Sequence, residues 1–135
     1  MMTTLDIVDI LWSRADGSSL KSSINGSLCK HRRDPNSTKE DIVFNCLPVN
    51  GEQLSKAIAN VNVFVPDIEV EANGQIDKQP NHTRLKALAS EAVGIYKENW
   101  TADLNYSVQQ QVLIADPDSG CHYINIRIEF FIENL

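Results

Sequence analysis

The strongest constraint in this sequence is an alternation of apolar and polar residues in two separate stretches. From His122 to Glu133 every second residue is large and apolar, and the same period of two recurs from Ile58 to Val65. Successive side chains of a β-strand point to opposite faces, so each stretch predicts a strand with one face in a core. The apolar sets are Ala59, Val61, Val63 and Val65 in one stretch and Ile124, Ile126, Ile128, Phe130 and Ile132 in the other.

The opposite face of the first strand is predicted to carry Ile58, Asn60, Asn62 and Phe64. A buried amide without a hydrogen-bond partner costs about 1–3 kcal/mol. This face is therefore either exposed to solvent, or it meets another chain or a helix that satisfies the amides. Contact with another chain is favoured because Ile58 and Phe64 would otherwise be exposed to water. Asn60, Asn62 and Phe64 are thus candidate interface residues, and we expect Asn62→Leu to disturb assembly more than folding.

Further strands are predicted on both sides of these two. Glu40–Leu47 is rich in β-formers, and the cluster Pro48–Gly51 separates it from Gln53–Asp67, a pattern typical of paired antiparallel strands. Asn105–Ala115 precedes a turn at Asp116–Gly120, which leads into the final strand.

Helices are predicted at the N-terminus and in the middle of the chain. Thr3–Arg14 has apolar residues at helical spacing, with Thr3 and Asp6 placed as a capping box. Thr83 to about Asn99 has a second apolar stripe, with Asn81 or Thr83 as its cap. Within it, Gly94 is expected to mark the close approach of another element.

The order of these elements predicts an α+β fold in one domain, residues 1–135. We expect a mainly antiparallel β-sheet packed on one face by the N-terminal helix and a long central helix. The length fits one domain of ordinary size, and 42% hydrophobic residues suffice for one core.

The stretch Ile68–Pro80 leaves two alternatives open. Asn73-Gly74 fits the turn of a small hairpin between Ile68–Ala72 and Gln75–Lys78, or the whole stretch is a mobile loop. Its acidic residues are the remaining candidates for contacts with a protein partner. They are Glu69, Glu71 and Asp77.

The charge balance argues against a surface that grips nucleic acid. There are 12 basic and 18 acidic residues, a net charge of −6, whereas phosphate contacts require basic patches. The basic run Lys30–Arg33 is short and is interpreted as a solvated turn, with contact to an acidic partner as the alternative. We therefore expect no sequence-specific nucleic-acid binding.

The residues also indicate no enzymatic or metal chemistry. The three cysteines and three histidines lack zinc-site spacing, and no nucleophile–base motif or phosphate-binding loop is present. We expect reduced thiols, no cofactor, no metal and no catalytic residue. The N-terminal residues do not resemble a signal peptide, and no stretch approaches the roughly 20 apolar residues of a membrane helix. A cytosolic protein without membrane contact is expected.

Three stretches of the chain resemble a known family. Gly26–Lys30, Asp34–Val43 and Asn60–Asp67, taken with the order of helices and strands, are similar to the tail terminator proteins of long-tailed phages and prophages. These proteins are also called tail completion or minor tail proteins. The resemblance covers most of the chain, although Ile68–Pro80 has no counterpart in it.

The resemblance implies a virion assembly protein that forms a ring, commonly a hexamer. Such a ring caps the tail tube and offers the surface for head–tail joining. Its implied partners are copies of itself, the tail-tube protein and a head-closure protein, and DNA passes through the ring. It implies assembly in the host bacterial cytoplasm and a final place in the virion tail or neck. Two alternatives stay open, a head-closure or neck adaptor protein and an unrelated α+β module that binds a small ligand or a peptide.

Overall fold

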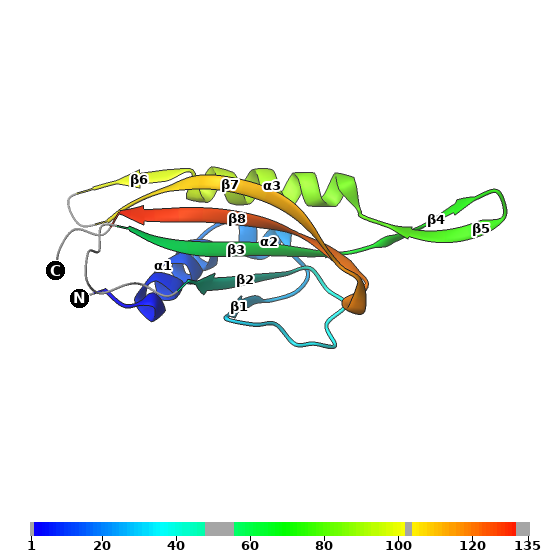
Figure 1. Ribbon diagram of the computed structural model, residues 1–135, viewed down its shortest axis with the longest axis horizontal. Helices are drawn as coiled ribbons and strands as arrows, with labels where there is room; N and C mark the ends of the chain where they lie inside the picture. The colour runs from blue at the N-terminus through cyan, green and yellow to red at the C-terminus, as the bar shows by residue number, and fades with distance from the viewer. Residues whose placement is uncertain (1, 48–55, 102–103, 132–135) are drawn as a thin grey trace.

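The computed structural model describes residues 2–47, 56–101 and 104–131 (Figure 1). Its helices are α1 (Thr4–Asp16), α2 (Leu20–Ser23) and α3 (His82–Tyr96), with a 3-10 turn, η1 (Pro117–Ser119). The shorter strands are β1 (Leu28–Lys30), β2 (Asp41–Cys46), β4 (Ile68–Ala72), β5 (Gln75–Gln79) and β6 (Glu98–Trp100). The long strands are β3 (Lys56–Pro66), β7 (Asn105–Asp116) and β8 (Cys121–Phe131).

The described strands form a six-stranded sheet in the order β1-β2-β3-β8-β7-β6 and a separate two-stranded sheet of β4 and β5. Every neighbouring pair is antiparallel except β1 and β2, which run parallel. Figure 1 shows β3, β8 and β7 side by side along the length of the body, with β4 and β5 projecting beyond its end. The predicted α+β class with a mainly antiparallel sheet is confirmed.

The predicted alternation of faces is confirmed in β3 and β8. The apolar set of β3 is almost fully buried, and Ile126, Ile128 and Phe130 of β8 are each no more than 1% exposed. Ile124 is half-buried at the margin of the core. The predicted turn Pro48–Gly51 and the end of the last strand at Ile132–Glu133 lie outside the described residues.

The core combines both long helices with these strands. It includes Ile7, Val8 and Leu11 of α1, Leu85, Leu88 and Tyr96 of α3, and the buried residues of β3 and β8. The hydroxyl of Tyr96 donates a hydrogen bond to the Leu11 carbonyl oxygen at 2.5 Å, which joins the two helices inside the core. Burial raises the pKa of Tyr96, so this hydroxyl remains a donor across the physiological range.

An ion pair ties α3 to the start of β2. Arg84 donates to both carboxylate oxygens of Glu40, at 2.5 Å from Nε and 2.9 Å from Nη2, and Nη2 also donates to the Ser23 carbonyl oxygen. The hydrogen bond to Glu40 raises the pKa of Arg84. Glu40 is only 7% exposed, so water hardly competes for this bidentate contact. The contact therefore fixes α3, α2 and β2 relative to one another.

The helix starts agree with the sequence prediction, and one helix end does not. Thr3 and Asp6 form the capping box, and the Asn81 side chain accepts a hydrogen bond from the Arg84 backbone, so Asn81 is the cap of α3. The predicted end of α3 near Asn99 is wrong. The helix ends at Tyr96 because the residues that follow pair with β7 as β6, a contact distant in sequence.

The expectation that Gly94 marks a close approach is also wrong. A Cβ atom at Gly94 would meet nothing within 4 Å. The crowded glycine is Gly26, where a Cβ atom would collide with the Glu40 carbonyl oxygen and the Asp41 carboxylate. Gly26 is therefore required by the space between the α2–β1 connection and β2.

Alanine substitutions at Gly94 and Gly26 are predicted to change the free energy of unfolding in opposite directions. Gly94→Ala should stabilise the chain by about 0.5–1 kcal/mol, because alanine favours a helix interior and the space is open. Gly26→Ala should destabilise it by about 1–3 kcal/mol, because backbone and carboxylate atoms must move. Urea unfolding of both variants measures the difference. A stable Gly26→Ala protein would contradict the packing described for the α2–β1 connection.

Candidate protein-interaction surfaces

Four asparagines form a hydrogen-bonded cluster on the sheet face opposite the core residues of β3. The Asn60 amide donates to Asn45 Oδ1 at 2.8 Å. The Asn125 amide donates to Asn60 Oδ1 at 3.0 Å and to Asn62 Oδ1 at 2.7 Å. We call Asn45, Asn60, Asn62 and Asn125 the asparagine cluster; it spans β2, β3 and β8.

The asparagine cluster corrects the argument made from the sequence. Asn60 and Asn62 were expected either to face solvent or to meet another chain or a helix. Instead, strand pairing places Asn45 opposite Asn60 and Asn125 opposite Asn62, so the sheet itself supplies hydrogen-bond partners. All four side chains are half-buried, which leaves their remaining polar atoms open to water or a partner. Their role in an interface stays a prediction.

Phe64 lies at one end of this face and is covered by its own chain. Its ring stacks on Tyr123 with 4.5 Å between centroids, and the Arg33 guanidinium lies 4.5 Å from the Phe64 ring centre. Arg33 also approaches the buried Asp41 carboxylate at 3.5 Å. Phe64 is therefore sandwiched between two side chains, and only part of it is left for another molecule.

Arg127 lies opposite Asn60 on the same face. Its Nε atom is buried and has no hydrogen-bond partner among the described residues. A buried donor without a partner is uncommon in native proteins, and the guanidinium gives this otherwise neutral region a positive charge. Nearby, Lys56 Nζ lies 3.3 Å from a carboxylate oxygen of Glu129, so the charges of these two residues balance each other.

The second candidate surface is the hairpin of β4 and β5, which we call the arm. The sequence left Ile68–Pro80 open between a small hairpin and a mobile loop, and the structure contains the hairpin. Asn73 and Gly74 at its tip both have positive φ, as a two-residue hairpin turn requires. Every residue of the arm is exposed except Val70, which is half-buried. The predicted interface residues Glu69, Glu71 and Asp77 are all on the arm and exposed.

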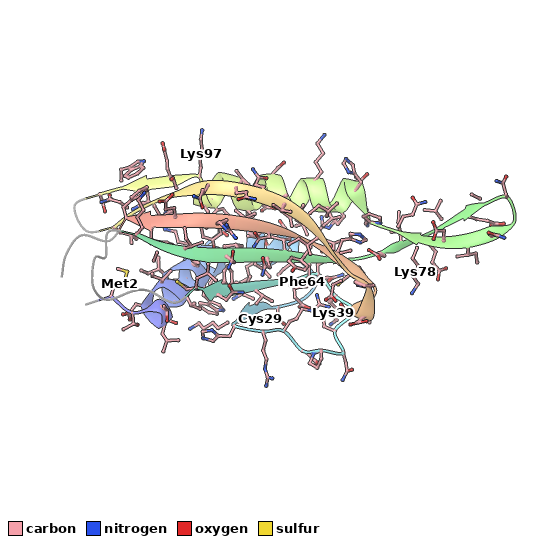
Figure 2. All side chains as sticks on the ribbon, viewed as in Figure 1. Met2, Cys29, Lys39, Phe64, Lys78 and Lys97 are labelled. Carbon is pink, nitrogen blue, oxygen red and sulfur yellow. The ribbon has the colours of Figure 1, made fainter. Side chains whose placement is uncertain are left out.

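The predicted interface residues thus fall in two places. Asn60, Asn62 and Phe64 lie together on the body, whereas the three acidic residues project beyond it. Figure 2 shows this separation through Phe64 on the body and Lys78 on the arm. The alternation in β3 predicted the first group, but no local pattern could reveal how far the arm extends from the body.

A third surface, not predicted from the sequence, is an apolar groove of about 650 Å³ between α3 and β7. Small residues of α3 make room for it, among them Ala89 and Gly94, and Leu113 of β7 lines it while remaining 49% exposed. Gly94 itself was the available signal in the sequence, but it was interpreted as the close approach of another element instead of a groove. The other lining residues are Pro80, His82, Leu85, Lys86, Ser90, Val93, Gln111 and Ile124.

Three thiols and one histidine have defined surroundings in the described residues. Burial raises the pKa of the thiols of Cys29, Cys46 and Cys121, which keeps them protonated and weakly nucleophilic at neutral pH. Nδ1 of His122 lies 2.6 Å from the Asp67 carboxylate, at the root of the arm. Within residues 2–47, 56–101 and 104–131, no three His, Cys, Asp or Glu side chains are grouped to hold a metal ion.

Comparison with known proteins adds no family. No protein-family model matches the chain, and no curated protein matches it. Among the helices of the described residues, none has the length and apolar character needed to cross a membrane.

The asparagine cluster yields a prediction about stability. Asn125→Ala removes the donor to both Asn60 and Asn62 and should lower the free energy of unfolding by about 1 kcal/mol, a modest loss because water reaches the freed oxygens. Thermal or urea unfolding measures it. Asn36→Ala is the control, since Asn36 is exposed and outside the cluster, and it should leave stability unchanged. Equal effects of the two substitutions would show that the cluster contributes nothing.

Proposed function

We propose that this chain is a non-enzymatic assembly protein of a tailed phage or prophage, of the tail terminator type. In this proposal its copies form a ring on the end of the tail tube and offer the surface to which the head attaches. The protein assembles in the host cytoplasm and ends in the virion tail or neck. The resemblance of Gly26–Lys30, Asp34–Val43 and Asn60–Asp67 to tail terminator proteins suggests the phage tail. The arm is the structural observation that supports an assembly role.

The arm favours an assembly role because its own chain gives it so little support. A two-stranded hairpin by itself is at best marginally stable in water. The arm pairs with no strand of the six-stranded sheet, and almost all of its side chains are exposed. Its outer backbone edges are therefore open to strands of another molecule. A projecting element of this kind is suited to holding a neighbouring protein.

The body supplies the second part of the proposal. We place α1 and α3 together on the face of the sheet that carries the core, so the opposite face, with the asparagine cluster, is left for partners. Those partners are the tail-tube protein on one side of the ring and the head-closure protein on the other. The net charge of −6 suits a ring that DNA crosses, because an acidic or neutral lumen does not hold phosphates.

Two other functions remain as rivals. A head-closure or neck adaptor protein would use the same arm but bind the head side. A ligand- or peptide-binding module is favoured by the groove between α3 and β7, which is apolar and has the volume of a small-molecule site. Genes for capsid, portal and tail-tube proteins beside the gene of this chain would support either phage role over the third.

Excision of the arm tests the proposal. Ile68 and Gln79 are paired at its root, so a short glycine link between Asp67 and Pro80 can close the body without strain. The shortened chain should keep its far-ultraviolet circular dichroism and lose co-sedimentation with tail tubes purified from the phage or prophage that encodes it. Trp100→Ala, at an exposed position on β6, is the control and should co-sediment as the parent does.

The other results have clear meanings. A parent chain that ignores tail tubes and binds purified heads is a neck adaptor. A parent chain that binds neither, or an armless chain that binds tubes as the parent does, contradicts the proposed role of the arm.

A further inference from the structure

The outer edge of β7 lacks a strand partner over most of its length. Its inner edge pairs with β8 along the whole strand, whereas β6 reaches only as far as Ser107. The Val108 amide donates to the Lys97 carbonyl oxygen at 3.0 Å, and beyond this bond no strand of the described residues covers the outer edge. We call Val108–Asp116 the free edge. A bulge between Val108 and Gln110 marks its start.

Apart from the bulge at its start and Asp116 at its end, the free edge lacks the usual protection against pairing with another chain. Natural edge strands are kept apart by charged side chains, proline or a covering element. The stretch Val108–Ala115 contains no charged residue and no proline. The side chains from Gln109 to Leu113 are all exposed, and Leu113 and Val112 are apolar. A long, uncharged and exposed edge of this kind is a template for an added strand.

The groove lies beside the same edge. Gln111 and Leu113 of β7 and Ile124 of β8 form its sheet side, and α3 forms the other. An added strand would lie about 4.8 Å beyond β7 and would direct every second side chain toward α3. The groove is mainly apolar, and Lys86 is the basic residue with a positive charge in its lining.

The arm has the complementary properties. Alternation in β4 places Ile68, Val70 and Ala72 on one face, and these are the apolar side chains that such a groove accepts. Asp77 is paired with Val70 and so shares this face, where its negative charge complements the positive charge of Lys86 in the groove lining. The five residues of β4 fit within the nine of the free edge. Figure 1 shows the arm directed away from the body, so its partner is another molecule.

We propose that the arm of one copy adds to the free edge of a second copy, with β4 beside β7 and its apolar side chains in the groove. The contact joins two different surfaces, so each copy keeps one arm and one edge free for further neighbours. Such a head-to-tail contact repeats around a ring when the rotation between copies closes. This inference rests on the proposed function for its biological setting and identifies the contact that builds the ring.

Two variants that each lose one half of the contact test it. Leu113→Lys places a charge in the groove and on the free edge, and its exposed position should let the chain fold. The armless chain lacks the other half. Leu5→Lys is the matched control, because Leu5 is 59% exposed on α1, away from both surfaces. Circular dichroism checks folding, and light scattering after size exclusion measures molar mass over a wide range of concentration.

The expected result is specific to a head-to-tail contact. The parent and Leu5→Lys should form oligomers, and Leu113→Lys and the armless chain should each be monomers. Mixed in equal amounts, these two should form a heterodimer and nothing larger, because the Leu113→Lys chain offers an intact arm and the armless chain an intact edge.

Several results would overturn the inference. They are oligomers of either variant alone, a mixture that stays monomeric, and a parent chain that is monomeric at every concentration. Failure of this inference can be distinguished from failure of the proposed function. A parent chain that binds tail tubes without this contact removes only the inference, whereas arm-to-edge oligomers that ignore tubes and heads remove only the phage role.

Discussion

The antiparallel pairing of β3 with β8 is the constraint on which the rest of the structure depends. It runs the full length of both strands, from Lys56 opposite Phe131 to Pro66 opposite Cys121. On one face it buries pairs such as Val61 with Ile126, and on the other it joins Asn62 to Asn125. A slip of one residue would turn the apolar set to solvent and separate the amides. The asparagine cluster therefore acts with the core to select one register.

The two strands also position the surfaces proposed for assembly. The arm continues directly from the end of β3, and its root is held by the Asp67 amide, which donates to the Gly120 carbonyl oxygen at 3.0 Å. The Asp67 carboxylate, paired with His122 at 2.6 Å, adds a second anchor. On the other side, β8 carries β7, whose outer edge is left free. One rigid pair of strands thus presents an arm and a complementary edge.

Local pattern was enough to predict the main elements. The period of two in Ile58–Val65 and His122–Glu133 reflects side chains that lie on a half-buried sheet, and burial confirms it in β3 and from Ile126 to Phe130 of β8. The capping box at Thr3 predicted the start of α1 because its hydrogen bonds are local. The amides of Asn60 and Asn62 were correctly identified as groups that need partners.

The errors concern features fixed by distant contacts. The donors and acceptors for Asn60 and Asn62 come from β2 and β8, and only the register of the sheet reveals them. β6 is held by pairing with β7. Gly94 faces a groove whose other wall includes Gln111 and Leu113, which are distant from it in sequence. Of the candidate site, the hairpin of the arm was one of two alternatives that the sequence left open, and the free edge could not be predicted because it depends on which strands do not pair.

Hydrogen exchange of the backbone amides tests most directly the claim that a rigid body presents two open strands to its own copies. At low concentration the account predicts strong protection in β3 and β8 and rapid exchange in the arm and at the outward-facing amides of β7 beyond Val108. At high concentration both open segments should gain protection together, while β3 and β8 change little. Oligomers in which the arm and the free edge still exchange rapidly, or monomers in which both are already protected, would contradict it.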